Sequence, residues 1–195
     1  MRRCVHLQLL LLGAALAAGC STTDNPLITR PQPVAWNVDA KIPDALRAPR
    51  GHVLLGHAVG RGVATFTVQA DPRDPNRRIW VVSDDEGGDL LDDEGSRIGQ
   101  HQGNTWSLRD GAQITAEPLA LVPQGRHLPW ALLATTSHSG RDNLSATEFI
   151  EQLHTVGGPP AARSRADVGT QVRAEYSADY YFYGPVAAQT RVARD

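Results

Sequence analysis

The stretch RAEYSADYYFYGPV, Arg173 to Val186, contains all four tyrosines of the chain and is the strongest guide to the fold. From Gln171 to Tyr176 apolar and polar residues alternate, and this period of two is typical of a half-buried β-strand. Ser177 to Asp179 predict a turn-like break, and Tyr180 to Tyr183 predict a second strand. The aromatic cluster therefore indicates strand structure at the end of the chain.

Alternation divides the aromatic residues of this last strand between two faces. Tyr180 and Phe182 fall on one face, whereas Tyr181 and Tyr183 fall on the other. Only one pair can point into the core of a sheet with a single buried face. The other pair stays available as a platform for a ligand.

The same strand pattern recurs from Gly51 onward. Short apolar runs are divided by glycine, proline and acidic residues, and Asp92–Ser96 and Arg109–Ala112 have the chemistry of hairpin turns. Strands at such close spacing predict an antiparallel β-sandwich or β-barrel with short turns and at most one short helix. We expect one all-β domain over residues 42–184, followed by a flexible tail over residues 185–195.

The segment SATEFIEQLHTVGG, Ser145 to Gly158, does not follow this strand pattern. Its apolar residues lie at i, i+3, i+4 and i+7, which is the spacing of one helix face, and Gly157 is suited to a C-cap. Propensity alone predicts a helix here.

The N-terminus predicts an export signal over residues 1–19. Arg2 and Arg3 precede an apolar run from Leu7 to Ala18, and a run of about a dozen residues is too short to span a bilayer, which takes about 20. The run ends in LAAGC, which resembles the lipobox of bacterial lipoproteins and implies acylation of Cys20. The usual leucine three residues before the cysteine is replaced by Ala17, so cleavage by an ordinary signal peptidase stays an alternative.

Lipidation at Cys20 would make the membrane a partner and would hold the protein firmly, since each buried methylene contributes about 0.8 kcal/mol. Ser21 after the cysteine implies the outer rather than the inner membrane of a bacterial envelope. Without acylation the product would be periplasmic or secreted. The only other cysteine is Cys4, inside the leader, so the folded part has no disulfide.

Charge argues against nucleic acid as a partner. Loss of Arg2 and Arg3 takes the formal net charge from −2 to −4, and no run of basic residues is present. Residues 20–41 predict a lipidated, proline-rich spacer, which would extend by about 3 Å per residue. Alternatively the proline-rich segment, which continues to about Gly51, lies on the domain as an arm, for which Trp36 and Ile42 supply apolar side chains.

A likeness to a known family runs along the chain from Ile42 to Tyr183. It rests on the motifs IPDALRAPRG, GRGVATFTV, IGQHQGNTW, LPWALL, HTVGGPP and SADYYFY, which occur in this order. The sequence resembles the uncharacterised secreted family called domain of unknown function 3455. The resemblance implies an exported protein without an assigned activity, and it implies a strand where Ser145 to Thr155 have helical spacing.

The chain also departs from the family pattern. The resemblance implies cysteines at Val68 and within residues 162–167, and both are absent, as expected if they normally form a bridge. A disulfide closing such a loop is worth about 2 to 4 kcal/mol. The stretch between His101 and Trp106 lacks a proline and one further residue, which weakens any transfer of a role to His101.

No motif predicts a cofactor or a metal ion. Gly60 and Gly62 supply two of the three glycines of a dinucleotide fingerprint, but Thr65 replaces the third and a strand follows in place of a helix. The acidic stretch from Asp84 to Gly95 does not match the spacing of an EF-hand. The histidines after the leader are not paired at the spacing of a zinc site.

The best polar cluster for catalysis is His101, Trp106 and Asp110. A histidine can act as a base with a carboxylate that orients it, so His101 and Asp110 predict an exported hydrolase as the alternative function. The competing interpretation is a hydrogen-bonded histidine of a strand.

Aromatic side chains are the candidates for ligand binding, because exposed rings accept sugars and apolar groups. Trp106 lies between Thr105 and Ser107 and is expected to be exposed, and one face of the last strand offers Tyr181 and Tyr183. Trp130 precedes an apolar run and is expected to be buried. The sequence thus favours a lipid-anchored envelope protein that binds a glycan or protein, or supports the envelope, without catalysis.

Overall fold

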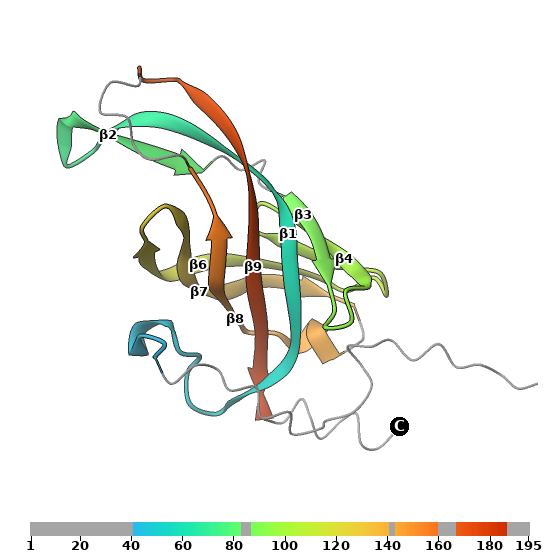
Figure 1. Cartoon of the computed structure of the whole chain (residues 1–195). Helices are drawn as coiled ribbons and strands as arrows, with labels where there is room; N and C mark the ends of the chain where they lie inside the picture. Colours follow the sequence, from blue (N-terminus) through green and yellow to red (C-terminus); the bar gives the residue numbers. More distant parts are fainter. Residues whose placement is uncertain (1–40, 83–86, 141–142, 160–166, 187–195) are drawn as a thin grey trace, which may run out of the picture.

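The computed structural model describes residues 41–82, 87–140, 143–159 and 167–186 (Figure 1). The predicted signal peptide, Cys20, Trp36, residues 20–40 of the expected spacer and residues 187–195 of the expected tail lie outside the described residues. The strands are β1 (His52–Asp71), β2 (Asp74–Val82), β3 (Gly87–Leu91), β4 (Arg97–Gln102), β5 (Thr105–Leu108), β6 (Gln113–Gln124), β7 (His127–Ser139), β8 (Phe149–Gly157) and β9 (Gln171–Pro185). Two short 3-10 helices accompany them, η1 (Asp44–Leu46) and η2 (Asn143–Ala146).

All nine strands belong to one antiparallel sheet whose pairings run in a ring. The order is β2-β1-β3-β4-β5-β6-β7-β8-β9, and β1 also pairs with β9, which returns the sheet to its start. The all-β prediction is therefore confirmed. One ring-like sheet replaces the expected sandwich or barrel, because β1 pairs with β2 and β3 at successive positions along the same edge.

β1 and β9 form the longest seam in the molecule and run side by side through its middle (Figure 1). Their register extends from His52 opposite Pro185 to Thr67 opposite Gln171. The predicted break at Ser177–Asp179 was wrong, since these residues continue β9 and pair with β1. Pairing with neighbours on both sides outweighs the local turn preference. The two hairpin turns are confirmed, at the β3–β4 and β5–β6 connections.

The glycines that resemble part of a nucleotide fingerprint are explained by packing. A Cβ on Gly60 would come within 2.4 Å of the Tyr180 ring, and one on Gly62 would meet the Gly87 carbonyl at 2.0 Å. Both lie inside β1, where the backbone must approach its neighbours closely. Neither lies before a helix.

The segment with helical spacing forms η2 and β8, as the family resemblance implied. Ile150 belongs to the apolar cluster inside the ring, whereas Leu153 belongs to a second cluster on the outer face. A strand with apolar contacts on both faces loses its simple alternation. The helical spacing of this segment follows from that double burial.

The face prediction for the last strand is confirmed. Tyr180 and Phe182 lie in the interior cluster, to which every strand except β2 contributes, and Tyr181 and Tyr183 lie in the outer cluster. A third, smaller cluster around Phe66 and Tyr176 lies toward β2.

Residues 41–51, here called the N-terminal strap, cover part of the outer face. Ile42 and Leu46 are buried there with Leu132, Leu153 and Tyr181. The arm interpretation is therefore correct for the strap itself, including Ile42. It closes the outer cluster beside β8 and β9.

Candidate functional site

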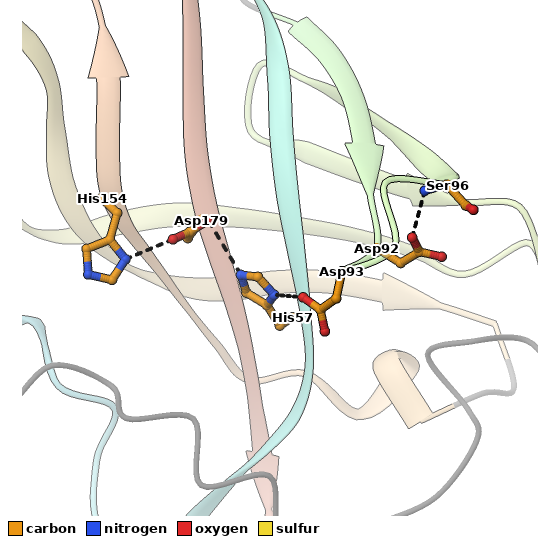
Figure 2. A network of polar contacts seen from close by, with 6 residues as sticks. All are labelled: His57, Asp92, Asp93, Ser96, His154 and Asp179. Carbon is orange, nitrogen blue, oxygen red and sulfur yellow. Dashed lines mark hydrogen bonds and ion pairs between the residues drawn. The ribbon is translucent and has the colours of Figure 1, made fainter.

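A polar network lies on the outer face where β1, β8 and β9 approach the β3–β4 turn (Figure 2). It consists of His57 on β1, Asp93 in the turn, His154 on β8 and Asp179 on β9, and we call it the histidine–aspartate network. Strand pairing sets the positions, because His57 lies opposite Tyr181 and Leu153 lies opposite Asp179. Segments far apart in sequence thus bring four titratable side chains together.

Asp179 is the centre of the network. One carboxylate oxygen lies 2.8 Å from Nδ1 of His154, and the other lies 3.5 Å from Nε2 of His57. Burial alone would raise the pKa of Asp179, but the contacts with the two histidines outweigh it and hold that pKa below its ordinary value. The carboxylate is therefore ionised at neutral pH.

His57 has a carboxylate beside each ring nitrogen. Its Nδ1 lies 3.0 Å from Asp93 and its Nε2 lies 3.5 Å from Asp179. A neutral imidazole carries one N–H, so both contacts are favourable together only when the ring is protonated. Burial lowers the pKa of His57, yet hydrogen bonds and charge from the two aspartates give a net increase above the ordinary value. The ring also packs on Tyr181 with centroids 4.7 Å apart.

His154 has a positive φ of 48°. It lies at an irregularity of the β8–β9 register between Leu153 and Val156, and such bulges re-aim a side chain. The neighbouring Thr155 is buried, and its hydroxyl donates to the Leu128 carbonyl at 2.5 Å. Positive φ is uncommon for a residue with a side chain and marks positions where strain is held by the surroundings. The bulge directs Nδ1 of His154 at Asp179.

Aromatic rings flank the network. The Trp130 ring on β7 meets the His154 ring edge-on, with centroids 5.6 Å apart, and Trp130 is half-buried. Tyr181 lies beneath both histidines, and burial together with the charge of Asp179 raises the pKa of Tyr181 to about 12. Trp130 and His154 thus share one partly exposed part of the outer face.

A buried carboxylate, Glu151 on β8, fixes the N-terminal strap. It accepts hydrogen bonds from the backbone N–H of Ala48 at 2.7 Å and from the hydroxyl of Tyr183 at 3.2 Å. Burial raises the pKa of Glu151, and these two donors oppose the increase. The Glu151 charge in turn adds to the effect of burial in raising the pKa of Tyr183. The Glu151 carboxylate therefore holds the N-terminal strap in place and is not positioned to contact a ligand in solvent.

The histidine proposed for catalysis, His101, lies inside the ring. It is 4% exposed, stacks on Trp106 at 4.8 Å, and has its Nδ1 3.1 Å from the Tyr176 hydroxyl and 3.4 Å from that of Tyr180. Burial lowers the pKa of His101 to about 4, against the weaker effect of a backbone hydrogen bond with Gly103. The ring is neutral and enclosed, which is the structural role that the sequence left open.

Asp110 lies apart from His101. It is exposed in the β5–β6 turn and accepts a hydrogen bond from the backbone of Ala112. Arg109 bonds to Ile98, three residues before His101 on β4, so Asp110 lies about 10 Å along the strands from His101. The two side chains do not form a base with its orienting carboxylate.

The expected exposures of two tryptophans were reversed. Trp106 is 1% exposed and belongs to the interior cluster, whereas Trp130 is half-buried on the outer face. Alternation places Trp106 on the same face of the short strand β5 as Leu108, and both side chains are buried in the interior cluster. Tyr181 is buried under the strap and the histidines, and Tyr183 is half-buried with its hydroxyl bonded to Glu151.

Sequence reasoning missed His57, His154 and Asp179 as a group. Two of the motifs that carry the family resemblance, HTVGGPP and SADYYFY, contain His154 and Asp179, but nothing in one sequence pairs them. The one available signal was an aspartate inside an otherwise aromatic strand. A charged residue there needs a partner on a neighbouring strand.

The fold and the network define an antiparallel all-β protein with a ring-like sheet and a histidine–aspartate network on its outer face. The family model described as "Protein of unknown function (DUF3455)" matches residues 79–184, which is more than half of the chain. The chain belongs to this family. Comparison with curated proteins and with solved structures gave no match.

Proposed function

We propose that the protein is exported, anchored to the bacterial envelope through a lipid on Cys20, and acts there as a binding module without catalytic activity. Support for export comes from the charged and apolar leader, and support for the anchor comes from the LAAGC sequence that ends it. In the part of the chain that the structure describes, no helix is long and apolar enough to cross a membrane.

Binding rather than catalysis is supported chiefly by the enclosure of His101. A general base must reach the proton that it removes, and His101 is sealed among Trp106, Tyr176 and Tyr180. The hydrolase alternative, with Asp110 orienting His101, therefore has no geometric support. The polar groups on the outer face, by contrast, are held in fixed positions by strand pairing, as a binding site requires.

Labelling with radioactive palmitate tests the anchor. The wild-type protein is expected to take up label, and Cys20→Ala is expected to take up none. Cys4→Ala is a matched control, because Cys4 lies in the leader and is removed with it. Equal labelling of wild type and Cys20→Ala would refute the lipid anchor.

Co-sedimentation with purified envelope fractions tests the binding role. We expect the mature protein, secreted as the unlipidated Cys20→Ala form, to sediment with peptidoglycan or outer-membrane material and to remain soluble alone. Failure to associate with any envelope fraction would overturn the binding role.

A further inference from the structure

His154 is the member of the histidine–aspartate network that has an unused hydrogen-bonding position. Its Nδ1 is taken by Asp179, whereas Nε2 points away from the network (Figure 2). Among the described residues no hydrogen-bond partner of Nε2 is found, and the side chain is 36% exposed. The bulge at His154 thus fixes the ring by one nitrogen and leaves the other for a ligand.

The contact with Asp179 also determines what Nε2 can do. A carboxylate accepts hydrogen bonds only, so Nδ1 of His154 carries the proton. In the neutral ring Nε2 is then an acceptor with its lone pair directed at the surface. A group that donates a hydrogen bond, such as a hydroxyl, is the complementary partner.

Trp130 provides the apolar part of the same surface. It lies on β7, next to β8, and its ring centroid is 5.6 Å from that of His154. Ligand sites commonly combine aromatic side chains with a few fixed polar groups. A ligand whose ring carries apolar C–H groups and several hydroxyls would complement Trp130 and His154.

Charge narrows the class of ligand. Asp179 lies against His154 and repels an anion there, while the charges of Asp93 and Asp179 are already directed at His57 and His154. Within the described ranges, no three histidine, cysteine or acidic side chains are placed to hold a metal ion. A neutral ligand is not repelled by these carboxylates and is not needed to neutralise them.

We propose that Trp130 and His154, with Asp179 as a positioning residue, form a binding site for a neutral sugar. The inference rests on the proposed binding function and assigns that function a place and a ligand class. The sugar ring packs on Trp130 and donates a hydroxyl hydrogen bond to Nε2 of His154. The strained bulge keeps the imidazole in place, so little freedom is lost on binding.

The test uses the mature Cys20→Ala protein with two probes, the trimer of N-acetylglucosamine and the trimer of glucosamine, which is cationic at neutral pH. Affinity is measured by calorimetry, and the Trp130 indole signal is followed by NMR. We expect the neutral trimer to bind with a dissociation constant in the millimolar range or better and to shift the Trp130 signal. The cationic trimer is expected to bind at least tenfold more weakly.

His154→Asn is the informative variant, because asparagine tolerates positive φ but places no acceptor at the Nε2 position. At least a tenfold loss of affinity is expected for His154→Asn and for Trp130→Ala. His138→Gln is the control, since His138 is exposed on β7 outside the site and should leave affinity unchanged. Thermal melting of each variant shows whether a loss of binding reflects unfolding.

Five results would overturn the inference. Absence of binding by the folded wild-type protein, or preference for the cationic trimer, would refute the ligand class. Unchanged affinity in folded His154→Asn, or a Trp130 signal that does not move, would refute the site. Envelope fractions that bind His154→Asn as well as wild type would leave the proposed function intact and refute only this site.

Discussion

Replacement of His57 should destabilise the fold in a way that depends on pH. His57 contacts Asp93 and Asp179 with its two ring nitrogens, and its pKa is raised above the ordinary value. A raised pKa in the folded state means that protonation stabilises the fold. This stabilisation is complete below the ordinary histidine pKa of about 6.5 and is lost as pH rises through the raised value.

The carboxyl group of Asp179 determines the lower end of the pH range in which this stabilisation is present. Its pKa is lowered in the folded state, so its contribution is present above the ordinary carboxyl pKa and is lost as pH falls through the lowered value. At pH 5.5 His57 is protonated and Asp179 is ionised. Above its raised pKa His57 is neutral and carries one N–H, which can serve only one of the two aspartates, and pH 9 is chosen to approach that state.

The expected magnitude follows from the two contacts of His57. The contact of His57 with Asp179, which is 26% exposed, is an ion pair at 3.5 Å without hydrogen-bond geometry, so we assign it about 1.5 kcal/mol, between the values for exposed and buried ion pairs. Asp93 is 49% exposed, and solvent screening reduces its share to about 0.5 kcal/mol. His57→Gln keeps one neutral donor and should cost about 2 kcal/mol at pH 5.5, but no more than about 0.5 kcal/mol at pH 9.

Urea unfolding at the two pH values measures this difference. With a denaturant slope of about 2 kcal/mol/M, the midpoint of His57→Gln should lie about 1 M below wild type at pH 5.5 and within about 0.25 M of it at pH 9. His138→Gln should follow wild type at both. An equal loss for His57→Gln at pH 5.5 and pH 9 would show that His57 contributes by packing and not by charge.

Variants at three other positions test the packing described above. Glu151→Ala leaves the Ala48 N–H and the Tyr183 hydroxyl without their acceptor, and it should lower the free energy of unfolding by about 2 to 4 kcal/mol in chemical unfolding. Glu151→Gln keeps an acceptor and removes a buried charge, so its free energy of unfolding should stay within about 1 kcal/mol of wild type. Leu46→Ala opens a cavity under the N-terminal strap and should lower the unfolding free energy by about 2 to 5 kcal/mol; a negligible change would mean that the strap does not contribute to the fold. Gly60→Ala would bring a methyl group against the Tyr180 ring and should lower the melting temperature by the equivalent of about 1 to 3 kcal/mol, unless that ring can move aside.

The fold class was predictable because strand alternation is a local property of the sequence. Tyr180 and Tyr181 could be assigned to opposite faces without any tertiary knowledge, and the turns at Gly95 and Gly111, both with positive φ, were predictable from their residues. The ring arrangement was not predictable, since it depends on which strands pair over long distances. The length of β1 was also hidden by its glycines, which ordinarily mark the end of a strand.

The candidate site was not predictable for a related reason. His57, Asp93, His154 and Asp179 come from three strands and a turn, and their meeting depends on the β1–β9 register and on a bulge in β8. His101 looked more promising only because Trp106 and Asp110 lie near it in sequence. Neighbours along the chain are an unreliable guide in a sheet where the contacts that matter cross between strands.

Where the family resemblance implies a disulfide, backbone hydrogen bonds hold the end of the β8–β9 connection against β1. Val68, where the family resemblance implies a cysteine, is buried, and its backbone exchanges hydrogen bonds with Thr170 and Gly169 at 2.9 Å each. Two such bonds contribute about 2 kcal/mol while they are formed, similar to the lower range for a disulfide, but they leave the unfolded chain unconstrained. The outer-face network lies farther along the same seam, where the ion pair between His57 on β1 and Asp179 on β9 crosses it.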